Sequence, residues 1–383
     1  MIVFVQVFGL NSPGGGARIL RSLLQDAPTS FLSICTTPKS PPPTHLGQEI
    51  HLPIRPYLGR VERTRFGGSL GYLNPLFVDR FKQRLEAVLR EAKPSAIHAI
   101  PQGVDFWYTF QIAEKLGIPY YLNVHDELTY NLQGKPELAE AIEGLAIVWA
   151  KAQGRIVISE AMGKEYCRRY GNLPYIVVTD GLATIPTAPR IKSHQKLNVY
   201  FMGSLHISYK ANFYALLQAL NQFSQVYPDW EVALTIRGEL PFPLKADRIT
   251  LKVLPWASQT EIDQDMNEAD LLYIPLPFEE AYQSFSRYSL STKLVTYLGS
   301  GLPILYHGPH NAAAGELLSQ HQAAIIADSL DPNAIQQSID NAKVMFQQIT
   351  ENALTLGRQQ FLLTEMRSRF WHFVADQTLQ PIR

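Results

Sequence analysis

The sequence predicts an α/β fold made of two doubly wound domains in tandem. Short apolar runs alternate with amphipathic helical stretches along nearly the whole chain, an order typical of parallel sheets with helices on both faces. A polar stretch with two prolines at residues 183–196 interrupts this alternation, which then restarts. At 383 residues the chain is also long for a single domain, which favours two.

The first half of the chain carries six short apolar runs that we predict to be strands: residues 2–7, 31–35, 96–100, 120–124, 155–159 and 175–179. Between them lie five stretches with the apolar spacing of amphipathic helices: residues 17–25, 76–91, 104–116, 136–152 and 160–170. This order predicts one parallel sheet, in a first domain that we place at residues 1–185.

The second half repeats the pattern in a domain that we place at residues 186–360. Its predicted strands are residues 197–203, 231–236, 249–254, 270–275, 303–306 and 323–327. Its predicted helices are residues 210–226, 260–268, 291–299, 311–320 and 332–349, and a last helical pattern at 352–376 carries four aromatic residues. Doubly wound sheets bind ligands outside the carboxyl ends of their strands, so we expect the site in a cleft between the domains.

The composition excludes several classes of function. Lysine plus arginine equals aspartate plus glutamate, at 34 each, so no overall charge favours nucleic acid. Two cysteines make no disulfide framework. The apolar start MIVFVQVFGL has no basic segment before it, so we interpret it as a strand rather than a signal peptide. No stretch approaches the roughly 18 apolar residues of a membrane-spanning helix, and we expect a cytoplasmic protein.

Two loops after predicted strands of the first domain are candidates for ligand binding. The loop GLNSPGGGAR contains Gly14, Gly15 and Gly16, which would let a ligand approach the backbone closely. A plain tight turn is the alternative, and the dinucleotide-binding spacing of glycines is absent. His125 follows the strand at 120–124 and precedes Asp126, so it would project from the carboxyl end of the sheet. A purely structural histidine is the alternative.

Two further candidate sites lie in the second domain. Lys210 opens a predicted helix soon after Gly203, where a cation opposes the helix dipole and indicates a nearby anion. The alternative is a solvated lysine. The helix that starts at Ser291, Thr292 and Lys293 offers backbone N–H groups to an anion. Ordinary capping by Ser291 is the alternative there.

The sequence provides little evidence for a metal site. Asp263 and Asp265 form an Asp-x-Asp pair, but it falls inside a predicted amphipathic helix, and we interpret it as a solvated helix face. No histidine and cysteine cluster has the spacing of a zinc site. A Walker loop and a nucleophile elbow are also absent from the sequence.

Together these segments resemble the GT-B glycosyltransferases, most closely the large retaining group called glycosyltransferase family 4. The resemblance spans almost the whole chain and is carried by short motifs: PGGGAR, VHDE, VISEAMGKEYCRRYG with VVTDGL, FMGSLHISYK, STKLVTYLGSGLPIL and GELL. It implies two Rossmann-like domains facing across a cleft, with a C-terminal helix at about 361–383 packing back on the first. It also implies sugar transfer from a nucleotide-sugar such as a UDP- or GDP-sugar, with retention and without a metal or cofactor.

The resemblance also implies roles for particular residues. His125 and Lys210 would be catalytic. The donor would bind to Gly203, Ser204, Gly238, Ser291, Thr292, Lys293 and Thr296, with the N–H groups of residues 291–293 on its diphosphate. The acceptor side would include Gly14, Gly15, Gly16, Arg18 and Asp126.

Three departures from the family pattern leave alternatives open. Ser204 and Leu205 occupy the region of the family's arginine, and Tyr288 and Thr296 occupy the positions of its two glutamates. A catalytically degenerate binding protein or partner subunit is therefore one alternative, and a nucleotide-sugar epimerase is another.

The acceptor is expected to be a glycan or a lipid-linked molecule. The stretch at residues 55–72 alternates Arg55, Arg60, Arg63 and Arg65 with aromatic residues and glycines. Such a loop could meet a lipid phosphate, an anionic glycan or the inner face of a membrane. A solvated loop at the rim of the active site is the alternative.

Overall fold

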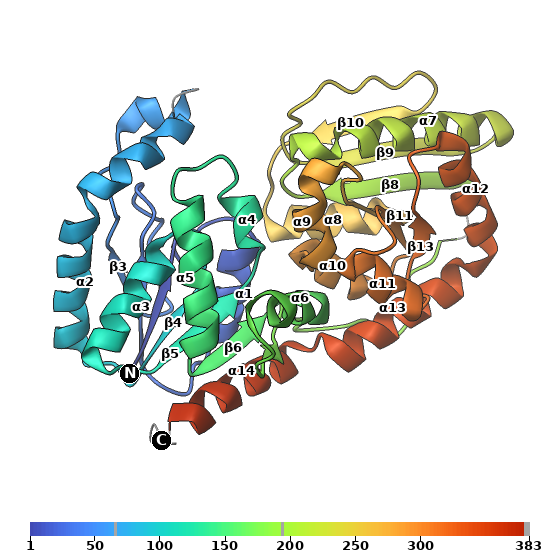
Figure 1. The fold of residues 1–383 in the computed structure, drawn as a ribbon. Helices are drawn as coiled ribbons and strands as arrows, with labels where there is room; N and C mark the ends of the chain where they lie inside the picture. Colours follow the sequence, from blue (N-terminus) through green and yellow to red (C-terminus); the bar gives the residue numbers. More distant parts are fainter. Residues whose placement is uncertain (65–66, 193–194, 379–383) are drawn as a thin grey trace. The chain divides into compact units, whose positions relative to one another are not determined.

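The computed structural model describes residues 1–64, 67–192 and 195–378. The chain divides into two compact units, each with its own parallel sheet (Figure 1). Unit 1 comprises Met1–Gly181 together with the C-terminal segment from Leu363, and unit 2 comprises Leu182–Leu362.

Unit 1 is built on a sheet of seven parallel strands in the order β3-β2-β1-β4-β5-β6-β7. The strands are β1 (Ile2–Gln6), β2 (Phe31–Cys35), β3 (Gln48–His51), β4 (Ala96–Ala99), β5 (Tyr120–Val124), β6 (Gly154–Val157) and β7 (Ile176–Val177). The strand order reverses between β1 and β4, which makes this the topological switch point of the sheet.

Each α-helix of unit 1 buries apolar residues. They are α1 (Gly15–Leu24), α2 (Val78–Ala92), α3 (Asp105–Leu116), α4 (Leu128–Asn131), α5 (Leu138–Lys151), α6 (Glu160–Tyr170) and α14 (Leu363–Thr378), with the 3₁₀ segments η1 (Gly59–Arg63) and η2 (Gly67–Leu76). In α2 the buried residues Phe81, Leu85 and Leu89 recur every fourth position, the spacing that places side chains on one face of a helix.

The C-terminal helix α14 packs within unit 1, although more than 180 residues separate it from the rest of that unit. Its Phe370 is fully buried and stacks near Phe4, with the ring centroids 6.3 Å apart. The indole N–H of Trp371 donates to the Leu23 carbonyl at 2.9 Å. Arg367 donates to the Ser22 carbonyl at 2.7 Å, so α14 is fixed against the end of α1.

Unit 2 holds a sheet of six parallel strands in the order β10-β9-β8-β11-β12-β13. The strands are β8 (Lys196–Met202), β9 (Glu231–Arg237), β10 (Thr250–Leu254), β11 (Leu271–Pro275), β12 (Ile304–His307) and β13 (Ile325–Ala327). Its helical segments are η3 (Ile207–Tyr209), α7 (Lys210–Val226), α8 (Gln259–Glu268), η4 (Glu280–Tyr282), α9 (Gln283–Tyr288), α10 (Thr292–Leu298), α11 (Ala313–Gln320), α12 (Pro332–Ala342), η5 (Lys343–Met345) and α13 (Phe346–Gln360).

Several sequence predictions of secondary structure are wrong, and the short helices α4 and α9 were not predicted. The edge strand β3 was missed, because Gln48–His51 is half-exposed and carries too few apolar residues to stand out. The predicted helix at 332–349 is divided into α12, η5 and the start of α13. The pattern at 352–376 is also two helices, because the backbone leaves the helical region at Phe361.

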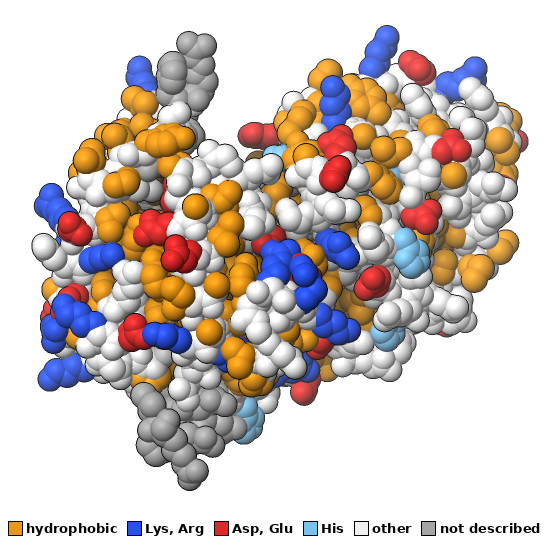
Figure 2. Space-filling model, viewed as in Figure 1, with side chains coloured by type: hydrophobic (Ala, Val, Ile, Leu, Met, Phe, Trp, Pro, Cys, Tyr) orange, Lys and Arg blue, Asp and Glu red, His pale blue; other side chains and the backbone are white. Residues whose placement is uncertain are grey.

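The surface carries no extended region of a single charge on the face seen in Figure 2, where basic and acidic side chains are interspersed over both units. None of the helices in the described ranges has the length and hydropathy needed to span a membrane.

Candidate functional site

Two glycines end neighbouring strands at the carboxyl edge of the unit 2 sheet. Gly203 follows β8 with a φ of 121°, and Gly238 follows β9 with a φ of 142°. Both values favour glycine over other residues. A Cβ atom on Gly238 would lie 2.5 Å from the Gly203 carbonyl oxygen. The two strand ends therefore pack closely against each other, and neither carries a side chain at this edge.

Helix α10 lies against the same edge. Its Tyr297 hydroxyl accepts a hydrogen bond from the Met202 N–H at 3.1 Å, which ties the helix to the end of β8. Ser291 caps the helix, since its hydroxyl accepts from the Leu294 N–H at 3.2 Å. Thr296 donates its hydroxyl proton to the Thr292 carbonyl at 3.0 Å, inside the helix.

The side chain of Lys293 brings a positive charge to this edge. Its Nζ lies 3.1 Å from the position of a Cβ atom on Gly203. It also lies 5.0 Å from the ring centroid of Phe201 and 6.0 Å from that of Tyr209. Burial lowers the pKa of Lys293 to about 8. Within the described residues no carboxylate forms an ion pair with it.

From sequence, Lys293 is expected to bind the donor and its N–H group to contact the diphosphate, with Lys210 on the same anion. The structure adds the position of the Lys293 side chain. The structure places Lys210 on the exposed first turn of α7, with its Nζ 5.7 Å from the ring centroid of Tyr214. Ser204 is exposed on the loop between β8 and η3.

His125 follows β5 in unit 1 and is buried. Neither ring nitrogen has a hydrogen-bond partner among the described residues. Burial lowers the pKa of His125 to about 4, so the ring is neutral at pH 7. A neutral imidazole carries one donor and one acceptor nitrogen, and here each nitrogen has less than 1 Å² of accessible surface.

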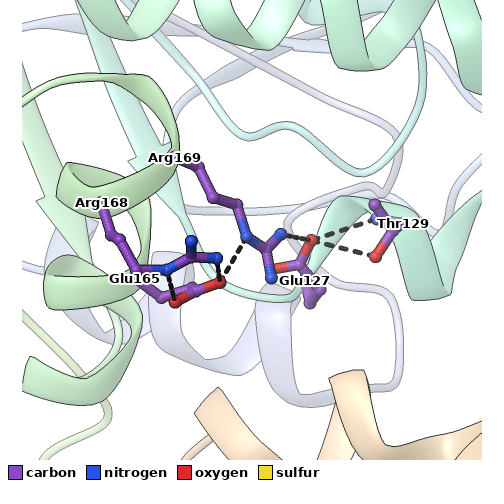
Figure 3. Close-up of polar contacts among 5 residues, drawn as sticks. All are labelled: Glu127, Thr129, Glu165, Arg168 and Arg169. Atoms are coloured by element: carbon purple, nitrogen blue, oxygen red, sulfur yellow. Dashed lines mark hydrogen bonds and ion pairs between the residues drawn. The ribbon is translucent and has the colours of Figure 1, made fainter.

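The loop that carries His125 is held by an ion-pair network (Figure 3). Arg169 lies 3.1 Å from the carboxylate of Glu127, whose side chain is fully buried, and 2.6 Å from Glu165. The Thr129 hydroxyl donates to the same oxygen of Glu127 at 3.0 Å. Arg168 binds the other end of the network, with its guanidinium 2.7 Å from Glu165.

The acceptor-side candidates lie at the start of α1 and in the loop after β5. Gly14 caps α1 with a φ of 120°, and Gly15 and Gly16 form its first turn. Arg18 makes an ion pair with the buried carboxylate of Asp180 at 2.9 Å. The Asp126 carboxylate accepts a hydrogen bond from Gln102 at 2.6 Å. Arg18 therefore has a structural partner within the family-like Asp-Gly-Leu segment.

The Asp-x-Asp pair lies on α8, and its two carboxylates differ in environment. Asp263 is exposed, whereas Asp265 binds Arg237 at 2.6 Å and accepts a hydrogen bond from Tyr200 at 3.1 Å. The interpretation of both acids as solvated is therefore wrong for Asp265. Over the described ranges, no group of three or more His, Cys, Asp or Glu side chains is placed to hold a metal ion.

The arginine-rich stretch is only partly available for a ligand. Arg55 is buried and makes a two-point ion pair with Glu62, one bond of which is 2.9 Å long. Arg60 is exposed. The Arg63 side chain and Arg65 lie outside the described part of the chain.

Two doubly wound units of this kind define the GT-B fold of glycosyltransferases, and solved structures with that fold match this chain nearly from end to end. HepE of Anabaena, solved with UDP and glucose, matches with a TM-score of 0.70 and 16% identity, over 98% of this chain and 99% of that one.

Two other matches come from different bacteria. The UDP-forming trehalose-phosphate synthase of Burkholderia xenovorans gives a TM-score of 0.62 and 12% identity, over 99% of this chain and 98% of that one. MurG of Acinetobacter baumannii gives a TM-score of 0.57 and 14% identity, over 98% of this chain and 99% of that one. No protein-family model matches the sequence, and no curated protein does so either.

Proposed function

We propose that the protein is a glycosyltransferase that moves a sugar from a nucleoside-diphosphate sugar to an acceptor hydroxyl. The fold supports this proposal, because HepE binds UDP and the trehalose-phosphate synthase forms UDP. The observation that carries it furthest is the Lys293 ammonium, which lies beside Gly203 and forms no ion pair with a carboxylate of the described residues.

The carboxyl edge of unit 2 suits a diphosphate. Lys293 supplies a partly desolvated cation beside the end of β8, where Gly203 and Gly238 carry no side chains. A charge-assisted hydrogen bond contributes about 1.5–3 kcal/mol, and such contacts gain strength as charge develops on the leaving group. Ser291, Thr292 and Lys210 are the further groups that we assign to the donor phosphates.

The reaction that we propose retains the anomeric configuration and needs no metal. The bond between the anomeric carbon and the diphosphate breaks, and the acceptor oxygen attacks the same face of the sugar. The departing phosphate oxygen takes the acceptor proton, so the products are the glycoside and the nucleoside diphosphate. No protein nucleophile takes part, and correct placement of the acceptor supplies much of the rate enhancement.

In this mechanism His125 binds the donor sugar through a neutral ring nitrogen. Its lowered pKa supports a neutral ring over a cation, and neither nitrogen has a hydrogen-bond partner in the described part of the chain. The glycine turn at Gly14–Gly16 would border the acceptor. We propose that the acceptor is a glycan or a lipid-linked molecule. Any contact of the protein with a membrane would be peripheral.

Binding without turnover is the second candidate. The position that we aligned with the family's first glutamate holds Tyr288, which is buried. At the position of the second glutamate, the Thr296 hydroxyl donates its proton to the Thr292 carbonyl within α10. Neither residue offers a carboxylate to the donor, which favours weaker recognition of the ribose or the sugar.

Incubation with a panel of UDP- and GDP-sugars in the presence of a chelator tests these functions. Release of free UDP or GDP, even by slow hydrolysis, supports the transferase. An altered sugar that is still attached to its nucleotide would identify an epimerase. Nucleotide binding with an unchanged donor would identify a binding protein, and activity that returns only with Mg²⁺ or Mn²⁺ would contradict metal independence.

A further inference from the structure

Helix α10 is short, and two of its side chains reach the end of β8. The helix comprises only seven residues, Thr292–Leu298, and a helix of that length is not stable in water by itself. Lys293 and Tyr297 are four residues apart, so their side chains lie on the same face of the helix. Tyr297 contacts the last residue of β8, and Lys293 contacts the glycine that follows it. The position of α10 therefore depends on contacts with the rest of unit 2.

The Tyr297 hydroxyl satisfies a backbone N–H group for which the sheet provides no partner strand. The pairing of β8 with β9 runs to Met202, but the pairing of β8 with β11 stops at Tyr200. The Gly203 N–H donates to the Arg237 carbonyl of β9 at 3.0 Å. The Met202 N–H donates instead to the Tyr297 hydroxyl at 3.1 Å. Since Tyr297 is fully buried, removal of its hydroxyl would leave this N–H group without a partner.

The buried side chains of α10 other than Tyr297 are apolar. They are Leu294, Val295 and Leu298. Apolar burial is non-directional, so it holds the helix against the sheet without fixing its position along its own axis. A hydrogen bond has a preferred distance and angle, and can fix that position. The bond with β8 is therefore the contact that sets where the first turn of α10 lies.

This first turn carries the Lys293 ammonium. Its Nζ lies 3.1 Å from the position of a Cβ atom on Gly203 and 5.0 Å from the ring centroid of Phe201. About one helical turn separates Lys293 from Tyr297. Because backbone hydrogen bonds make such a turn rigid, a shift of Tyr297 moves Lys293 by a similar amount.

We propose that Tyr297 is a positioning residue of the donor site: through the Met202 N–H, its hydroxyl fixes the turn of α10 that holds the Lys293 ammonium beside Gly203. The inference rests on the proposed function, because that function assigns Lys293 to the donor phosphates. Tyr297 itself contacts no phosphate. It acts through Lys293, so its hydroxyl matters for the donor only while the ammonium is present.

A double-mutant cycle on UDP affinity tests this dependence on Lys293. The four proteins are the wild type, Tyr297→Phe, Lys293→Met and the variant with both substitutions, and calorimetry measures each dissociation constant. Phenylalanine keeps the buried ring and removes the hydroxyl. Ile339→Val is the control for a loss of stability alone, because Ile339 is buried on α12, in a different hydrophobic cluster of unit 2 from Tyr297.

We expect Tyr297→Phe to weaken UDP binding about threefold to tenfold, as for the loss of one net hydrogen bond. In the Lys293→Met background the same substitution should change the dissociation constant less than about twofold. Ile339→Val should leave the dissociation constant unchanged. The proposal is overturned if Tyr297→Phe binds UDP like the wild type, if its effect is as large without Lys293, or if Ile339→Val weakens binding equally.

NMR of the full chain labelled with ¹³C at lysine Cε gives a second measurement that needs no nucleotide. The signal of Lys293, identified by its absence from Lys293→Met, should be displaced by the rings of Phe201 and Tyr209. We expect Tyr297→Phe to move this signal toward those of exposed lysines, and Ile339→Val to leave it in place. An unmoved signal in Tyr297→Phe would overturn the proposal. If the signal moves as expected but the wild type binds neither UDP nor GDP, the proposed function fails and the positioning by Tyr297 stands.

Discussion

The Lys293 ammonium lies 3.1 Å from the point where Gly203 would carry a Cβ atom, at the end of the first strand of unit 2. This relationship explains why the strand ends in glycine, since any side chain there would meet the ammonium and would also be strained at a φ of 121°. It also places a positive charge at the carboxyl end of β8.

Replacement of Lys293 by methionine should weaken UDP binding about tenfold to a hundredfold, because the variant keeps the shape of the side chain and removes its charge. The range follows from about 1.5–3 kcal/mol for a charge-assisted hydrogen bond. Isothermal titration calorimetry measures the dissociation constant. Lys252→Met is the control, because Lys252 is exposed on β10 of the same unit. Equal affinities in the two variants would remove Lys293 from the donor site.

The affinity for UDP should fall as the pH rises through 8. Burial lowers the pKa of Lys293 to about 8 in the free protein, and a diphosphate, which binds the protonated form, raises that pKa in the complex. Binding is therefore strongest below pH 8 and takes up protons above it. The terminal phosphate of UDP, with a pKa of about 6, is already ionised there.

Titration calorimetry at pH 8.5, in buffers of different ionisation enthalpy, measures this proton uptake. The uptake should disappear in Lys293→Met. A dissociation constant that is the same at pH 7 and pH 9 would show that Lys293 stays protonated without the ligand.

Arg169→Ala should lower the free energy of unfolding by about 3–5 kcal/mol, because it leaves the buried Glu127 carboxylate without its cation. Arg168→Ala removes a guanidinium that is 71% exposed in the same network, and should cost at most about 1 kcal/mol. Urea unfolding followed by circular dichroism compares the two variants. Similar losses for both would mean that the ion pair with Glu127 adds little to stability.

His98→Phe should make unit 1 more resistant to acid. His98 is buried against Tyr121, with the two rings parallel and 4.6 Å apart, and neither ring nitrogen has a partner in the described chain. Burial lowers its pKa from 6.5 to about 3. The unfolded state therefore binds more protons between pH 3 and pH 6.5, and the wild type loses stability as the pH falls through that range.

From pH 6.5 to pH 4.5 the loss from this group is about 2–3 kcal/mol, at about 1.4 kcal/mol for each pH unit. The difference between the urea midpoints at pH 6.5 and pH 4.5 should therefore be smaller in His98→Phe than in wild type. The control His45→Phe should keep the wild-type difference, because His45 is exposed in unit 1. An acid loss of wild-type size in His98→Phe would assign the sensitivity to other groups.

The core of both sheets was predictable from sequence because their strands are nearly uniform apolar runs. Phe31–Cys35 and Tyr120–Val124 were placed with their observed bounds, since all residues of both strands are buried. Strand β3 was not predictable, because Gln48–His51 pairs only at the edge of the sheet and contains a single apolar residue, Ile50. The break at Phe361 was also hidden, since helical periodicity continues on both sides of it.

The candidate site was less predictable, because its geometry depends on contacts between distant segments. The direction of the Lys293 side chain depends on packing against Phe201 and Tyr209, about 90 residues earlier. Glu127 is buried because Arg169, on α6, reaches it. Local patterns placed such residues at the correct edge of a sheet but could not show which charges are already paired.

The most direct test of nucleotide-sugar transfer is NMR of a UDP-sugar labelled with ¹³C at the anomeric carbon. While the sugar is attached, this carbon is coupled to the phosphorus of the diphosphate. With the protein and a glycan acceptor, we predict that the coupling disappears as UDP accumulates, much faster with wild type than with Lys293→Met. The new anomeric signal should have the configuration of the donor. A coupling that persists for every UDP- and GDP-sugar tested would contradict the account.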